Sequence, residues 1–212
     1  MKEKIPGIKL APELINFDEA DAEWIVEEYV ELALFQHSKI RKLVRDVLPE
    51  LYGNTCYQGR FGIEELPSLQ STKNGKISEL IETFTRENYS LPYAYCHGDM
   101  TKSNILKDTQ GNVLISDWEN SGYRPVSTDL SRLYLHHKDV RDEIVSLLDS
   151  CSGQDRKSVP SRLQIAIALE AFLNKVAENT GNKLNKKQRA TDHRGRALIE
   201  ELLAYESELL AG

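Results

Sequence analysis

Three residues with oxygen-bearing side chains, Asp99, Asn104 and Asp117, have the types and spacing that chemistry on phosphate esters needs. Asp99 and Asn104 are separated by four residues, and Asp117 follows an apolar run. A carboxylate can orient an attacking hydroxyl and accept its proton, while two further oxygen donors hold Mg²⁺ against nucleotide phosphates. The sequence therefore predicts phosphoryl transfer from ATP, with Asp99 as general base and with Asn104 and Asp117 as ligands of Mg²⁺.

A β-hairpin is expected to bring these residues together. Residues 108–112 have the composition of a tight turn, which would join strands at 105–107 and 113–116. This hairpin would return the chain from Asn104 to Asp117, so the polar loop and Asp117 should converge. The alternatives are that Asp99 and Asn104 only form turns and that Asp117 only caps a strand. Two turns would not require this spacing.

The remaining pattern is mainly helical. Two short strands are expected near residues 14–15 and 23–26, ahead of a helix that begins at Ser38. Apolar residues recur at helical spacing in four segments, which are 40–48, 77–84, 162–177 and 187–210. Ser90 and Pro92 are expected to close the second helix. Residues 54–74 are rich in glycine and polar residues, which predicts a loop.

Composition restricts the class of protein. The chain has 212 residues and a formal net charge of −6, which argues against broad binding to nucleic acid or to an anionic membrane. No apolar run reaches the roughly 18–20 residues that span a bilayer, and the first ten residues lack the apolar core of a secretory signal. Cys56, Cys96 and Cys151 form no CxxC pair. We expect free thiols and a cytoplasmic protein.

The segment around Asp99 resembles the catalytic and metal-binding loops of the aminoglycoside phosphotransferase and choline kinase family, which has a protein-kinase-like fold. The family pattern is His-Gly-Asp, an Asn five positions after that Asp, an Ile-Asp-Trp/Phe-Glu segment, and then Asp-Leu. The matching residues are His97, Asp99, Asn104, Asp117, Trp118, Glu119, Asp129 and Leu130.

The resemblance implies an α+β fold with a mainly helical C-terminal catalytic lobe over residues 31–212. Residues 1–30 would be a remnant of the N-terminal lobe sheet, in which Glu28, Tyr29 and Val30 meet adenine at the hinge. His97 would act with Asp99 by bracing the catalytic loop, and Asp129 would be a buried carboxylate that supports the loop backbone.

Other side chains leave two interpretations open. Lys102 would neutralise the transferred phosphate or would simply be an exposed lysine. Glu119 would assist the metal site or would be a solvated carboxylate. His136 and His137 are adjacent and do not share a helix face, so they predict no metal site.

The chain also departs from the family pattern. Few residues precede the expected hinge, so the glycine-rich loop and the phosphate-binding lysine of a full nucleotide lobe have no counterpart. Sheet edges left uncovered by this difference would favour a homodimer or a partner chain. Two functions follow: an ATP-dependent kinase of a small-molecule hydroxyl, and a kinase-derived binding module. Acidic residues on the C-terminal helices would favour a cationic or sugar-like ligand, and the chain could also be a fragment.

Overall fold

A computed structural model describes seven ranges of the chain, which are residues 14–17, 25–27, 39–62, 67–70, 72–152, 157–181 and 183–211. Side chains are described for residues 39–62, 68–70, 72–152, 157–181 and 183–205. The expected adenine-binding residues Glu28, Tyr29 and Val30 lie outside the described residues, so their assignment stays a prediction.

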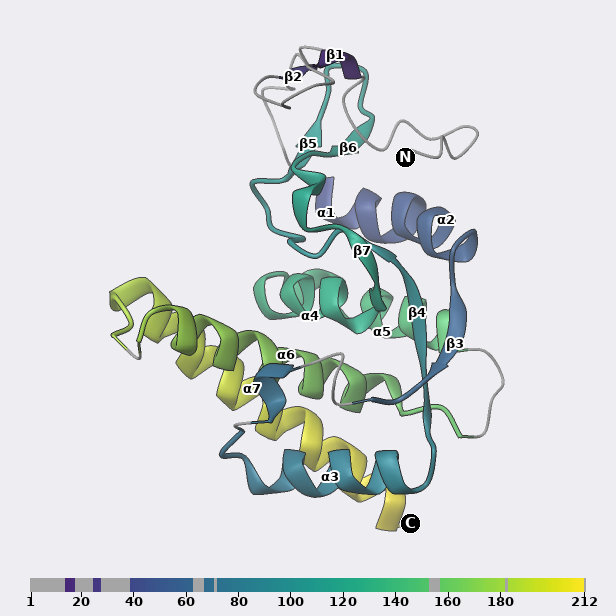
Figure 1. The fold of residues 1–212 in the computed structure, drawn as a ribbon. Coiled ribbons are helices and arrows are strands. Elements are labelled where there is room, and N and C mark those ends of the chain that lie inside the picture. The colour runs from purple at the N-terminus through teal and green to yellow at the C-terminus, as the bar shows by residue number, and fades with distance from the viewer. Residues whose placement is uncertain are drawn as a thin grey trace.

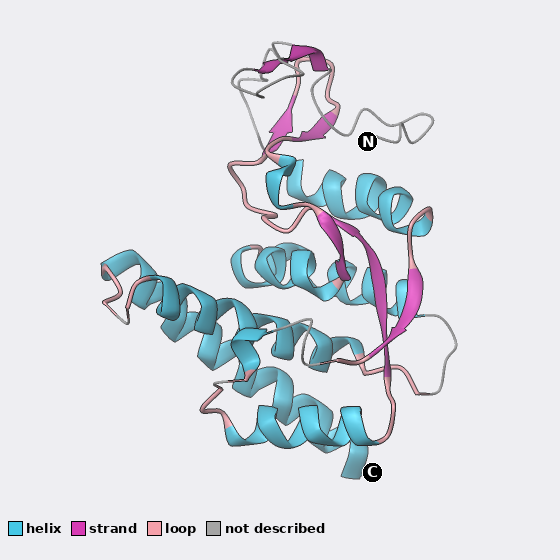
Figure 2. Cartoon of the chain, in the orientation of Figure 1, coloured by secondary structure: helices cyan, strands magenta, loops and turns pink. Residues whose placement is uncertain are grey.

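Small antiparallel sheets and a larger helical region make up the fold (Figures 1 and 2). Strands β1 (Leu14–Phe17) and β2 (Ile25–Glu27) pair with each other, close to the positions predicted from the sequence. A three-stranded sheet has the order β3-β4-β7, with β3 at Tyr57–Arg60, β4 at Ser90–Cys96 and β7 at Gly122–Pro125. This combination agrees with the predicted α+β fold.

The prediction of a loop over residues 54–74 is wrong in part. This segment contains β3 and a short 3₁₀ turn, η3 (Pro67–Leu69). The residues of β3 are mostly exposed and show no alternation of apolar side chains, so the strand arises from pairing with β4 rather than from a local pattern. Ser90 and Pro92 do not close a helix either. They lie within β4, where Pro92 pairs with Gln58.

The first helical segment buries the face that was predicted to be apolar. It comprises α1 (Lys39–Lys42), the π-helical η1 (Leu43–Val47) and α2 (Leu48–Gly53). Helix α3 (Gly75–Arg86) begins after Asn74, whose side-chain oxygen accepts the backbone N–H of Ile77. This contact is a standard N-cap and fixes the start of the helix.

Four helices form the core of the C-terminal region. They are α4 (Ser127–His136), α5 (Arg141–Ser152), α6 (Ser161–Asn179) and α7 (Lys186–Ala211), with a short 3₁₀ turn, η5 (Lys138–Val140), before α5. Helix α6 contacts α4, α5 and α7, which explains why most of its first thirteen side chains are buried. Helix α7 approaches α6 closely at Gly195, where a Cβ would lie 2.8 Å from Leu173 Cδ1.

No helix in the described ranges combines the length and the apolar character that crossing a bilayer requires.

Candidate active site

A β-hairpin carries the candidate site, as the turn composition predicted. Strand β5 (Ile105–Lys107) pairs with β6 (Val113–Ile115), and Ile105 lies opposite Ile115. In the connecting turn, Asp108 Oδ1 accepts the backbone N–H of Asn112 at 2.7 Å, and Gly111 has a φ of 88°. Because Ile105 and Ile115 pair, the residues that flank the hairpin, Asn104 before β5 and Ser116 and Asp117 after β6, lie at the same end of it.

Asp99 and Asn104 contact each other directly. The Nδ2 atom of Asn104 donates to Asp99 Oδ2 at 3.1 Å and to the Asp99 backbone carbonyl at 3.0 Å. Because these bonds use the amide nitrogen, the amide oxygen of Asn104 is the atom left for another partner. The Asp99 side chain is 34% exposed, so it is open to a ligand from solvent.

Asp117 adjoins the same loop through the backbone of Ser116. The N–H of Ser116 donates to the Asn104 carbonyl at 2.9 Å. Asp117 itself has a φ of 65° and precedes the 3₁₀ turn η4 (Trp118–Asn120). Its side chain is exposed and makes no hydrogen bond with the described part of the chain. A non-glycine residue in this left-handed region is uncommon and is often found at functional sites.

A glycine holds the loop close to this turn. Gly98 has a φ of 82°, and a Cβ there would collide with the backbone oxygen of Asn120. The same oxygen accepts a hydrogen bond from Arg124 at 2.8 Å. The loop that carries Asp99 and the segment after Asp117 are therefore in backbone contact, which requires glycine at position 98.

Beneath the loop lies a buried set of polar residues. Asp129 is fully buried, and its two oxygens accept the backbone N–H groups of His97 at 2.7 Å and Gly98 at 2.8 Å. Tyr52 donates its hydroxyl to the same carboxylate at 3.3 Å. Burial raises the pKa of the Asp129 carboxyl, while the bonds from Gly98 and His97 act in the opposite direction. Asp129 thus occupies the supporting position that the family resemblance implied.

His97 links the loop to the hairpin. Its Nδ1 atom accepts the backbone N–H of Asp99 at 3.1 Å, so its Nε2 carries the proton and donates to the Ser116 carbonyl at 2.8 Å. The ring is fully buried and lies edge-on to Trp118. His97 therefore touches both Asp99 and the residue before Asp117, without being open to a ligand.

Two basic residues at the site were missed by the sequence analysis. Arg132 on α4 forms an ion pair between its NH1 atom and Asp99 Oδ1. Lys39 is 6% exposed and donates its Nζ to the carbonyls of Ile105 at 2.5 Å and Lys102 at 3.1 Å. Burial is the main cause that lowers the pKa of Lys39. A signal for Arg132 existed, because it follows Asp129 by three residues and so shares its helix face.

The other predicted residues lie at the surface of the site. The side chain of Lys102 is exposed, and its backbone carbonyl is the group that contacts Lys39. Glu119 is also exposed and accepts a bond at 3.2 Å only from its neighbour Asn120 among the described residues. Among the described residues, His136 and His137 belong to no metal-binding cluster. In the described ranges no group of three or more His, Cys, Asp or Glu residues could hold a metal.

The chemistry of the donors suits Mg²⁺ nevertheless. Mg²⁺ prefers oxygen ligands and is commonly bound by one or two protein carboxylates together with substrate phosphates and water. Asp117 offers a carboxylate that has no partner among the described residues, and Asn104 offers an amide oxygen on the adjoining backbone segment. Two such donors fit a metal that arrives with a nucleotide, whereas a dedicated metal cage would need more ligands.

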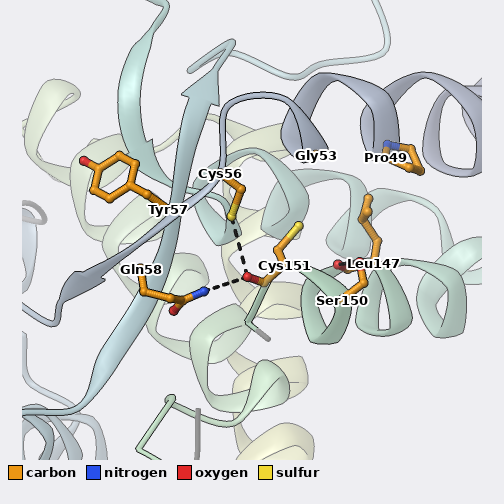
Figure 3. Close-up of a pocket in the computed structure, with 8 residues that line it drawn as sticks. All are labelled: Pro49, Gly53, Cys56, Tyr57, Gln58, Leu147, Ser150 and Cys151. Carbon is orange, nitrogen blue, oxygen red and sulfur yellow. Dashed lines mark hydrogen bonds between the residues drawn. The ribbon is translucent and has the colours of Figure 1, made fainter. Parts of the chain in front are cut away.

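A cavity of about 260 Å³ lies elsewhere, between the start of β3 and the end of α5 (Figure 3). Cys56 and Cys151 line it, and the Cys56 thiol donates to the Cys151 carbonyl at 3.5 Å. Both thiols are free. Burial raises the pKa of Cys56 and raises that of Cys151 to about 12, so both thiols remain protonated near neutral pH. This cavity contains none of the residues predicted for phosphoryl transfer.

Comparison with solved structures identifies kinase-like neighbours. The choline kinase LicA from Streptococcus pneumoniae has a TM-score of 0.59 and 19% identity over 91% of this chain and 75% of its own. A choline/ethanolamine kinase family protein from Mesorhizobium loti gives 0.55 and 20% identity, over 90% of this chain and 75% of its own.

A third neighbour is an aminoglycoside phosphotransferase from Alicyclobacillus acidocaldarius. It has a TM-score of 0.54 and 12% identity over 97% of this chain and 78% of its own. The structural similarity to these three proteins establishes the fold, which is the protein-kinase-like fold predicted from the sequence. A comparison with curated protein sequences gave no match.

The family of the chain is identified from its sequence. A sequence model described as choline/ethanolamine kinase matches residues 51–206, which is most of the chain and includes Asp99, Asn104, Asp117 and Asp129. The chain belongs to the choline/ethanolamine kinase family.

Proposed function

We propose that this protein transfers the γ-phosphoryl group of ATP to a hydroxyl group of a small molecule. The observation that carries the proposal is the joining of Asp99, Asn104 and Ser116 by hydrogen bonds, which puts Asp117 beside the loop. Membership of a kinase family and structural likeness to phosphotransferases support the same reaction. Nucleotide binding is further supported by a LicA structure determined with AMP.

In the proposed reaction, Asp99 accepts a hydrogen bond from the acceptor hydroxyl and orients its oxygen. A bond forms between that oxygen and the γ-phosphorus of ATP, the bond from this phosphorus to the β–γ bridging oxygen breaks, and ADP leaves. The hydroxyl proton passes to Asp99. Such a base contributes a factor of about 10²–10⁴ to a rate. Asp99 is held in position by two contacts: Asn104 donates to its carboxylate, and its backbone N–H donates to the buried ring of His97.

Asn104 and Asp117 would hold Mg²⁺ through the amide oxygen and the carboxylate. When bound, this ion neutralises negative charge on the phosphates during transfer. Lys102 is the proposed nearby cation for the transferred group. Its exposed side chain equally suits a solvated lysine. Glu28, Tyr29 and Val30 remain the proposed contacts to adenine.

A binding module without transfer activity is the second candidate. The ion pair between Arg132 and Asp99 favours it, because that contact engages Oδ1 of the proposed base while Asn104 already donates to Oδ2. A kinase must have room for the acceptor hydroxyl at the other carboxylate oxygen or must release Arg132. Turnover therefore separates the two candidates.

The test is phosphoryl transfer from ATP to a panel of small alcohols with Mg²⁺, compared between wild type and Asp99→Asn. We expect the variant to lose about 10²–10⁴-fold in kcat, with its melting temperature nearly unchanged. Asp108→Asn is the matched control, since Asp108 is a carboxylate in the hairpin turn of the same motif. Equal turnover of wild type and Asp99→Asn would reject Asp99 as the base. ATP binding with no transfer to any alcohol would favour the binding module.

A further inference from the structure

Lys39 is a buried lysine whose charge has no acidic partner in the described part of the chain. Burial is the first cause that lowers its pKa, and the positive charge of Lys102 is the second. A lowered pKa means that folding disfavours the charged form, so the charge by itself does not stabilise the protein. The reason for a lysine at this position therefore lies in its hydrogen bonds.

Both hydrogen bonds of Lys39 go to the loop between Asp99 and strand β5. The Nζ atom donates to the carbonyl of Lys102 at 3.1 Å and to the carbonyl of Ile105 at 2.5 Å. These carbonyls flank Asn104, since Lys102 precedes it by two residues and Ile105 follows it directly. One ammonium group therefore joins the backbone on the two sides of the proposed metal ligand.

The other polar groups of Asn104 are held as well. Its backbone N–H donates to the Thr101 carbonyl at 3.1 Å, and its carbonyl accepts the N–H of Ser116 at 2.9 Å. Its Nδ2 atom donates to the Asp99 carbonyl and carboxylate. Because the amide plane is fixed by these bonds, the backbone on either side of Asn104 determines where its amide oxygen points. The bonds from Lys39 act on that backbone.

A second lysine of the same helix contacts the hairpin at its other end. Helix α1 lies against β5 (Figure 1). Lys42 is exposed and donates its Nζ to the Gly111 carbonyl in the hairpin turn at 2.7 Å. It follows Lys39 by three residues and so lies on the same side of the helix. The chain thus offers two lysines that join one helix to one hairpin, of which only Lys39 contacts the loop that carries Asn104.

The carboxylates of the site do not neutralise Lys39. Asp99 pairs with Arg132 instead, and neither Asp117 nor Glu119 forms an ion pair with Lys39 within the described ranges. Asp117 and Glu119 are exposed, whereas Lys39 is buried against backbone carbonyls. The negative charge of the rim therefore stays available on the exposed side of the loop, and Lys39 holds the loop from the buried side.

We propose that Lys39 is a positioning residue for the metal site. By bonding the carbonyls on both sides of Asn104, it keeps the amide oxygen of Asn104 where it can bind the same Mg²⁺ as Asp117. Lys39 itself touches neither the metal nor the substrates. Groups that hold metal ligands from outside typically contribute about 10–100-fold to metal affinity or activity. This inference rests on the proposed kinase function and adds a residue to its site.

The first measurement asks whether Lys39 holds the loop, and it uses the full chain without metal or nucleotide. Amide hydrogen exchange is compared among wild type, Lys39→Met and Lys42→Met, since methionine has a similar length and no donor. Lys39→Met should speed exchange over residues 103–106 by about 10-fold or more, because a charged donor is lost. Lys42→Met is the matched control and should speed exchange only in the turn at residues 108–112.

The second measurement asks whether this support acts on the metal. The affinity for ATP is measured by calorimetry with EDTA and with saturating Mg²⁺, and the ratio of the two dissociation constants is the magnesium gain. Lys39→Met should lose most of a wild-type gain of about 10-fold or more, with its affinity in EDTA within about twofold of wild type. Lys42→Met should keep the wild-type gain. General loss of structure would weaken binding in EDTA too, so the ratio separates positioning from stability.

Lys39→Gln is the second variant, because it keeps N–H donors on a shorter, uncharged side chain. We expect an intermediate magnesium gain, and this variant carries both measurements if Lys39→Met does not fold. Unchanged exchange over residues 103–106 in both variants would overturn the inference, and so would an unchanged magnesium gain. A larger gain would also overturn it, since the charge of Lys39 would then repel the metal. A wild type without any gain would reject the metal site itself, whereas a normal gain that survives in Lys39→Met would reject only the role of Lys39.

Discussion

Two aspartates of the site have the same side chain and opposite surroundings. Asp129 belongs to the loop floor, defined here as Tyr52, His97 and Asp129, and both of its oxygens are occupied by protein donors. Asp117 belongs to the site rim, defined as Asp99, Asn104 and Asp117, where it is exposed and unpaired in the described part of the chain. A carboxylate that is buried with its oxygens on protein donors supports structure, whereas a solvent-accessible one is available to a ligand.

The largest effect is expected from removing the floor carboxylate. Asp129→Ala leaves two buried N–H groups and the Tyr52 hydroxyl without their acceptor. Each unsatisfied buried group costs about 1–3 kcal/mol, so we expect a loss of about 3 kcal/mol or more in the free energy of unfolding. Chemical denaturation measures this loss. A change below 1 kcal/mol would show that water replaces the carboxylate and that the floor does not support the loop.

The rim carboxylate should behave in the opposite way. Asp117→Asn keeps a residue that tolerates the left-handed backbone, so the free energy of unfolding should change by no more than about 0.5 kcal/mol. Mg²⁺-dependent turnover should fall about 100-fold or more, because one of two oxygen ligands loses its charge. Steady-state kinetics and denaturation of the same sample separate the two effects. If Asp117→Asn were substantially destabilised and kept normal turnover, Asp117 would be a structural residue and not a ligand of the metal.

The two environments also differ in their dependence on pH. Burial raises the pKa of Asp129, so the folded protein holds this proton more tightly than the unfolded chain does. The resulting contribution to stability is fully present below the unfolded pKa of about 3.9 and is lost as pH rises through the folded pKa. The destabilisation caused by Asp129→Ala should therefore be larger near pH 4 than near pH 7. A destabilisation that grows with pH would mean that the hydrogen bonds from His97 and Gly98 outweigh burial.

The smallest effect is expected at Glu119, next to the rim. Its exposed carboxylate is bonded only to the neighbouring Asn120 in the described ranges. Glu119→Gln should change both the free energy of unfolding and the activation free energy of turnover by no more than about 0.5 kcal/mol. A drop in turnover that higher Mg²⁺ concentrations restore would instead give Glu119 a place at the metal.

Local signals were enough to predict the rim. The turn at residues 108–112 predicts the hairpin. Because strand pairing fixes which residues lie opposite each other, the hairpin in turn places Asp117 near Asn104. The apolar spacing in 40–48 and 77–84 likewise predicted helices, since one face of each is buried.

Tertiary contacts explain what the sequence did not reveal. Strand β3 exists through its pairing with β4, and its own residues give no strand pattern. Arg132 reaches Asp99 from 33 positions along the chain. Its role could have been inferred only by combining the expected position of Asp129 with the three-residue spacing on α4. Lys39 contacts the loop from 63 and 66 positions away, so no local pattern could assign it.

The most direct test of the account is the effect of Mg²⁺ on ATP affinity in wild type and Asp117→Asn, measured by calorimetry on the full chain with and without EDTA. If Asn104 and Asp117 hold the metal with the nucleotide, Mg²⁺ should tighten ATP binding by about 10-fold or more in wild type, which is 1.4 kcal/mol or more. The variant should show little or none of this gain. An equal gain in Asp117→Asn, or no gain in wild type, would contradict a single magnesium and nucleotide site at the rim.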